Sequence, residues 1–259
     1  MITKDQIIQT IKSMIEPLDF VYGLFEGGAI AFGRDDEYSD IDLHIVAADD
    51  QVTEVLPIIE KALAELAPLR DKYEVPQPTW HGHHQTFFRL EGHPDWLMID
   101  CAVINDSAED KFLEPEIHGH HVVHFDKTGI HDSLPLYDFS KTENKIKRRL
   151  QIMGPHMQMM SHLPSKFLLR GKNIEAFHFY NGLILRPLLM LLRIKYDPKR
   201  YDWSARYLYD YLPEGDVLKF EQLHFVASPE DLGGKIDEAL VWFWELHAEM
   251  LERHVTNHV

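Results

Sequence analysis

The sequence has one cysteine, Cys101, among its 259 residues. A single cysteine cannot close an intrachain disulfide, which excludes the small disulfide-stapled secreted domains and favours a reducing compartment such as the cytoplasm. Long apolar runs are also missing, because no stretch approaches the roughly 20 residues of a membrane-spanning helix. Polar and charged side chains recur through the first 12 residues, which argues against a signal peptide. We therefore expect a cytoplasmic protein without a membrane partner.

Positive charge is scarce. The chain carries 26 Lys and Arg against 42 Asp and Glu, a formal net charge of −16. This balance disfavours a long nucleic acid as partner, since neutralising a phosphate backbone requires an excess of basic side chains. It is compatible with a nucleotide held through metal ions or with a small cationic substrate, and solubility alone explains it equally well. The apolar share of 45% is that of an ordinary globular protein.

Residues 1–135 are predicted to form an α+β domain. Thr3 followed by Gln6 fits a capping box, and isoleucines at helical spacing follow it. A second amphipathic helix is expected over 55–66. Segments 85–90 and 96–104, separated by a turn at 92–95, are expected to form a hairpin. The strands predicted in this domain are 20–25, 40–47, 85–90, 96–104 and 120–125.

Residues 136–259 are predicted to form a second, helical domain, because strand signals end near residue 141. The boundary falls in a loop that contains Ser133, Pro135 and Asp138. The predicted fold class is therefore a mixed sheet with helices followed by an all-α domain. The helices expected there are 142–162, bent at Gly154 and Pro155, then 174–196, 201–211, 217–226 and 232–254.

Three aspartates mark a candidate site. Strand alternation places Asp40 and Asp42 on one face, together with His44. Asp100 is the only charged residue in the apolar run 96–104. Unpaired carboxylates are costly to desolvate, so a positive group should face them. If the two strands are neighbours, the three carboxylates converge and provide oxygen ligands for two divalent metal ions.

A purely structural explanation competes with this one. Asp40 would cap a turn, Asp42 would lie on a solvated edge, and Asp100 would pair with Arg34 or Arg89. That explanation serves for any one of the aspartates taken alone. The three together, directly after a glycine turn, favour the metal site.

The segment around these aspartates resembles a known signature. Gly27 and Gly28, a short helical turn, and the sequence Ser-Asp-Ile-Asp-Leu at 39–43 are similar to the signature of the DNA polymerase β-type nucleotidyltransferase superfamily. Asp100 falls where that superfamily has its third carboxylate. The resemblance covers residues 20–125, and the helical remainder is similar in layout to aminoglycoside and lincosamide nucleotidyltransferases. It implies a polymerase-β-like fold for the first domain.

The resemblance also implies a reaction. A nucleoside monophosphate, AMP from ATP, would pass to a hydroxyl of a small acceptor, releasing pyrophosphate. Asp40 and Asp42 would hold two Mg²⁺ ions, and Asp100 would ligate the catalytic ion and take the hydroxyl proton. Aminoglycoside- and lincosamide-like antibiotics are candidate acceptors. The resemblance does not determine which base the nucleotide carries, and it leaves a homodimer possible.

The nucleotide site follows from the same resemblance. Backbone N–H groups around Gly27 and Gly28 would cradle the β- and γ-phosphates, with Arg34 and Ser39 as further contacts. One departure is Ala29, which stands where many members of the superfamily have a serine. An alternative is therefore a nucleotide-binding regulatory or antitoxin-like module with weak or no turnover.

The tetrapeptide His-Gly-His-His occurs twice, at 81–84 and 118–121. Imidazole clusters suggest zinc, but there is no cysteine partner and the spacing matches no zinc motif. The competing interpretation is two polar segments whose histidines make local hydrogen bonds. A histidine near the acceptor site is the preferred functional use.

Overall fold

The computed structural model describes residues 2–79, 81–109 and 111–256. The chain divides into two compact units, residues 1–137 and residues 138–259. The first unit is built on a mixed sheet with helices, and the second is helical, as the sequence predicts. Among the described residues, no helix is long and apolar enough to cross a bilayer.

The sheet of the first unit has six strands in the order β3-β4-β5-β2-β1-β6. The central pair, β2 and β5, is parallel, and the other four neighbouring pairs are antiparallel. Parallel pairing brings the beginnings of β2 and β5 to the same edge of the sheet. The strands are β1 (Val21–Glu26), β2 (Ile41–Ala47), β3 (Leu69–Glu74), β4 (His84–Leu90), β5 (Ile99–Asn105) and β6 (Val122–Asp126).

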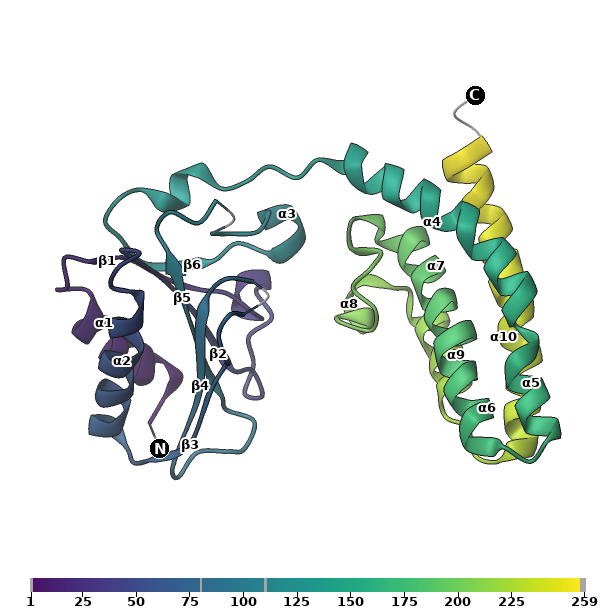
Figure 1. Ribbon diagram of the computed structural model, residues 1–259, viewed down its shortest axis with the longest axis horizontal. Helices are drawn as coiled ribbons and strands as arrows, with labels where there is room; N and C mark the ends of the chain where they lie inside the picture. Colours follow the sequence, from purple (N-terminus) through teal and green to yellow (C-terminus); the bar gives the residue numbers. More distant parts are fainter. Residues whose placement is uncertain (1, 80, 110, 257–259) are drawn as a thin grey trace. The chain divides into compact units, whose positions relative to one another are not determined.

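Helices α1 (Lys4–Ile15) and α2 (Val52–Leu66) lie side by side along one face of this sheet (Figure 1). The capping box predicted from Thr3 and Gln6 is present and opens α1. The core on this face takes alternate residues of β2, Ile41, Leu43 and Ile45, together with the isoleucines of α1. The intervening residues of β2 therefore belong to the opposite face.

The opposite face carries a second, smaller apolar cluster. Phe25, Val46, Ile104 and Phe112 pack together there, near the carboxyl ends of β2 and β5. The short helix α3 (Pro115–His118) follows Phe112 in the chain. The beginnings of β2 and β5 lie outside this cluster and carry the polar side chains described below.

Strand β3 was not predicted. Its sequence, LRDKYE, lacks the apolar alternation of a half-buried strand, and five of its six residues are exposed. It forms the edge of the sheet, where charged side chains are common because they discourage pairing with other chains. Its place is set by antiparallel pairing with β4, in which Tyr73 stacks on Phe87.

The helical unit contains seven α-helices within the described residues. A π-helical turn, Tyr180–Leu185, joins α6 to α7, so the helix expected over 174–196 is present as three consecutive segments. The α-helices are α4 (Phe139–Met160), α5 (His162–Leu169), α6 (Asn173–Phe179), α7 (Arg186–Tyr196), α8 (Leu208–Tyr211), α9 (Glu214–His224) and α10 (Pro229–Leu251).

The prediction of a helix over 201–211 was wrong for most of its length, because only α8 at its end is α-helical. Ser204 and Tyr207 have positive φ, which lies outside the range of a right-handed helix, so the predicted helix cannot run through either residue. The fully buried Arg193 donates to the carbonyl oxygens of Ser204 and Arg206 and to Asp197. This buried guanidinium therefore ties down an irregular segment.

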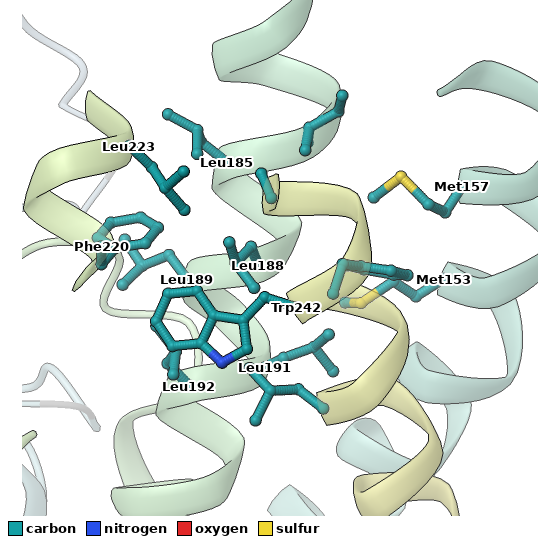
Figure 2. Close-up of a cluster of buried hydrophobic side chains, with 14 of the residues drawn as sticks. Met153, Met157, Leu185, Leu188, Leu189, Leu191, Leu192, Phe220, Leu223 and Trp242 are labelled. Carbon is teal, nitrogen blue, oxygen red and sulfur yellow. The ribbon is translucent and has the colours of Figure 1, made fainter. Parts of the chain in front are cut away.

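The core of this unit is a set of leucines on α7 that surrounds Trp242 of α10 (Figure 2). Phe220 and Leu223 of α9 close one side of the cluster, and Met153 and Met157 of α4 close the other. Both methionines are buried, so they act in packing here.

This core generates a stability prediction. Leu188→Ala removes a side chain with no exposed surface and should lower the free energy of unfolding by about 2–5 kcal/mol. Leu169→Ala is the matched control, because Leu169 is 89% exposed and its truncation should cost under about 0.5 kcal/mol. Urea unfolding followed by circular dichroism measures both. Equal losses for the two variants would contradict the assigned core.

Candidate active site

The register between β2 and β5 places Asp42 directly beside Asp100. The predicted neighbourhood of the two strands is thus confirmed. Both aspartates alternate with core residues, so their side chains lie on the face opposite α1 and α2. Asp40 precedes β2 by one residue, and its charge contributes to raising the pKa of Asp100. Asp40 is therefore close enough to act on the same patch.

Asp100 is partly buried, and that burial is the main reason why its pKa is raised to about 6. The side chain that donates to it is Gln85 of β4, whose Nε2 lies 2.8 Å from both carboxylate oxygens. This contact lowers the pKa and offsets part of the burial effect. Arg89, one of the arginines considered as partner, instead lies 4.0 Å from Asp71. The sequence analysis did not identify Gln85.

The glycine turn lies against the aspartates. The Gly27 N–H donates to the carbonyl oxygen of Asp42 at 2.8 Å. Gly28 has φ +66°, and a Cβ there would lie 1.7 Å from Oδ2 of Asp42. Only glycine allows so close an approach between this backbone and the carboxylate. Because the Gly27 N–H is already used, contact with a ligand is left to the N–H groups that follow it.

The expected helical turn after the glycines is present as a short 3₁₀ segment, Ile30–Phe32, which ends at Gly33. The guanidinium of Arg34 lies 5.5 Å from the ring centre of Phe32. The Ser39 hydroxyl donates to Asp36 Oδ1 at 2.9 Å and accepts from the Asp36 N–H at 3.0 Å. Ser39 therefore closes the turn that leads into Asp40.

Two neutral histidines lie against the glycine turn, where a Cβ at Gly27 would meet both His44 and His121. Burial lowers the pKa of His44 to about 3 and that of His121 to about 4. Their rings are 5.2 Å apart, edge to face, and His83 also acts on His44. Both His-Gly-His-His segments thus contribute a residue to the surroundings of His44. With such low pKa values, His44 and His121 are uncharged at neutral pH and offer hydrogen bonds only.

The donor chemistry of this patch suits a hard divalent cation, because Mg²⁺ prefers carboxylate oxygens. Asp42 and Asp100 supply such oxygens from adjacent strands, with Asp40 next to them. In the described ranges, no group of three or more His, Cys, Asp or Glu side chains is gathered around one point. A bound ion would accordingly rest on the Asp42–Asp100 pair first.

Comparison with known proteins gave no match to any protein family and none to any curated protein. Among solved structures, the chain is similar to an aminoglycoside 6-adenyltransferase from Bacillus subtilis, with 14% identity over 96% of this chain and 90% of that chain, and a TM-score of 0.39. A nucleotidyltransferase-like protein from Exiguobacterium sibiricum gives 11% identity, coverages of 96% and 76%, and a TM-score of 0.37. A spectinomycin adenyltransferase from Enterococcus faecialis, solved with ATP and spectinomycin, has 12% identity over 93% of this chain and 100% of that chain, with a TM-score of 0.35.

The close approach at Gly28 can be tested with a matched pair of variants. Gly28 and Gly33 have nearly the same positive φ, so alanine should cost each about 1–2 kcal/mol in backbone strain. A Cβ at Gly33 meets nothing within 4 Å, whereas at Gly28 it overlaps Asp42. Gly28→Ala should therefore lose about 1–3 kcal/mol more than Gly33→Ala in urea unfolding. Equal losses would show that the turn does not press on Asp42.

The raised pKa of Asp100 predicts a pH-dependent effect of Asp100→Asn in metal-free protein. Because the folded pKa of about 6 exceeds the ordinary 3.8, stability from this group is complete below pH 4 and lost as pH rises through 6. The variant should therefore exceed wild type by about 2–3 kcal/mol at pH 8 and match it near pH 4. Denaturant unfolding at both pH values measures this, with the exposed Asp50→Asn as control. A difference that does not change with pH would contradict the assignment.

Proposed function

We propose that this protein is a metal-dependent nucleotidyltransferase that transfers AMP from ATP to a hydroxyl of a small acceptor and releases pyrophosphate. The observation that carries the proposal is the pairing of Asp42 with Asp100 on parallel strands, with the Gly28 backbone against Asp42. Paired carboxylates cannot attract a triphosphate by themselves. Divalent ions between them and the phosphates would supply the missing positive charge.

The aspartates take distinct roles in this proposal. Asp40 and Asp42 would hold two Mg²⁺ ions, and Asp100 would share one of them. Asp100 also takes the proton of the acceptor hydroxyl as the new oxygen–phosphorus bond forms and the bond to pyrophosphate breaks. Its place beside Asp42 and its contact with Gln85 put its carboxylate next to the proposed ions, where an acceptor hydroxyl would be activated.

The nucleotide contacts are assigned to the turn that follows β1. Gly28 lets the backbone approach the Asp42 carboxylate, and Gly27 lets it pass close to His44 and His121. The N–H groups from Gly28 onward are proposed to face the β- and γ-phosphates. Arg34 adds a positive charge on the same segment. Ser39 contributes by closing the turn before Asp40.

The acceptor is proposed to be a small polyhydroxylated and cationic molecule, with aminoglycoside- or lincosamide-like antibiotics among the candidates. The net charge of −16 favours such an acceptor. The neutral His44 and His121 offer hydrogen bonds to hydroxyl groups without repelling a cation. The single free cysteine is buried and fits a reducing, cytoplasmic setting, where ATP and Mg²⁺ are abundant.

Calorimetric titration of ATP and GTP, each with and without Mg²⁺, tests the nucleotide site. Wild type should bind ATP only with Mg²⁺, and Asp40→Ala/Asp42→Ala should weaken binding at least tenfold because the carboxylates that hold the ions are gone. Asp50→Ala controls for the loss of negative charge elsewhere, since Asp50 is exposed. Absence of binding by wild type, with and without candidate acceptors, would overturn the proposal.

Turnover is then measured as pyrophosphate release across a panel of hydroxylated acceptors. Asp42→Asn should reduce it at least 100-fold, about 2.7 kcal/mol of transition-state stabilisation. Undiminished turnover of this variant would overturn the assigned chemistry. Tight Mg-ATP binding without release for any acceptor would favour a regulatory or antitoxin-like module, the role that Ala29 at the usual serine position suggests.

A further inference from the structure

A chain of side-chain contacts runs outward from Asp100 through Gln85 to His81. Gln85 Nε2 lies 2.8 Å from each oxygen of Asp100, and Gln85 Oε1 lies 3.1 Å from Nε2 of His81. Gln85 pairs with Ala102 on β5, two residues along from Asp100, so both side chains lie on the same face of the sheet. His81 is the first residue of the first His-Gly-His-His segment.

The Asp100 carboxylate determines the direction of each hydrogen bond in the series Asp100–Gln85–His81. An ionised carboxylate only accepts, so the Gln85 amide must point its NH₂ group at Asp100 and its oxygen at His81. His81 must then donate from Nε2, which leaves Nδ1 as an acceptor. The backbone N–H of His83 donates to this Nδ1 at 3.2 Å, in agreement with the same tautomer.

The segment that carries His81 is itself fastened. It connects β3 to β4, and the Thr79 hydroxyl donates to the carbonyl oxygen of His83 at 2.8 Å. Gln77 Nε2 donates to the same oxygen at 3.2 Å, and Val75 N–H donates to the Gln85 carbonyl at 2.9 Å. The described residues on both sides of His81 are therefore tied to one another by hydrogen bonds.

We propose that Gln85 and His81 are positioning residues that fix the plane and direction of the Asp100 carboxylate. A carboxylate that accepts from one amide through both oxygens cannot rotate freely, and the amide cannot flip while His81 donates to its oxygen. The role in turnover rests on the proposed function, because an oriented Asp100 is ready to take the acceptor proton. The orientation itself does not depend on turnover. His81, in the first histidine segment, thus has a role in geometry.

The orientation is tested without any activity assay, from the tautomer of His81. Long-range ¹H–¹⁵N spectra at pH 8.5 should show His81 with its proton on Nε2 in wild type. The His83 N–H keeps the His81 proton on Nε2 in every variant. Asp100→Leu removes the acceptor that directs the amide, and Gln85→Leu removes the amide, so each should shift the ¹⁵Nε2 resonance of His81 as its bond to Gln85 is loosened or lost. A proton on Nδ1 in wild type, or a His81 signal unchanged in both variants, would overturn the proposal.

The effect on turnover is tested by pyrophosphate release. Gln85→Leu should lower kcat at least tenfold while changing KM for ATP less than twofold, because Asp100 remains present but is no longer oriented. His81→Leu should lower kcat three- to tenfold, and His81→Gln, which restores a donor, should recover most of it. The double variant Gln85→Leu/His81→Leu should be no more than twofold slower than Gln85→Leu, since His81 acts through Gln85.

His120→Leu is the matched control, an exposed histidine of the second tetrapeptide, and its kcat should stay within twofold of wild type. An active wild type with unchanged kcat in Gln85→Leu would reject the positioning role and leave the proposed function standing. An inactive wild type whose His81 signal still responds to Asp100→Leu and Gln85→Leu would reject the proposed function and leave the orientation of Asp100 standing.

Discussion

The parallel pairing of β2 with β5 brings Asp42 and Asp100 together. The geometry of the candidate site in the first unit depends on this pairing. Two carboxylates in adjacent register repel each other, and partial burial adds a desolvation cost. The apolar core beneath them, which packs β2 and β5 against α1 and α2, holds the strands in that register. The fold therefore stabilises an arrangement that the two side chains alone would oppose.

The neighbours of the pair differ in how they act on its charge. Gln85 donates to both oxygens of Asp100, and the glycine turn brings backbone against Asp42 without a side chain between them. His44 and His121 lie close but stay neutral through burial, so they do not compensate the charge.

The sequence predicted the placement of Asp42 and Asp100 better than that of their surroundings, because this placement depends on alternation. Period-two patterns place Asp42 and Asp100 on a face, and a lone charge in an apolar strand identifies Asp100. Gln85 was not predicted because its partner Asp100 lies diagonally opposite it on the neighbouring strand. This relation can be recognised only when the register of β4 and β5 is known. Strand β3 escaped because an exposed edge strand has no apolar pattern. The irregular segment after α7 escaped because it depends on the buried Arg193, which no local pattern reveals.

The charge of the candidate site would also constrain how the triphosphate of the proposed reaction reaches it. A face with aspartates and neutral imidazoles repels a bare polyanion, and the net charge of −16 extends this repulsion over the surface. A metal-bound triphosphate carries less negative charge and meets carboxylate ligands on arrival. Selectivity for the metal complex over the free nucleotide would then arise from the same electrostatics that hold the metal. Arg34 supplies a single positive charge on the glycine-turn segment. The aspartates and the ions they are proposed to hold would therefore account for most of the selectivity for the metal-bound nucleotide.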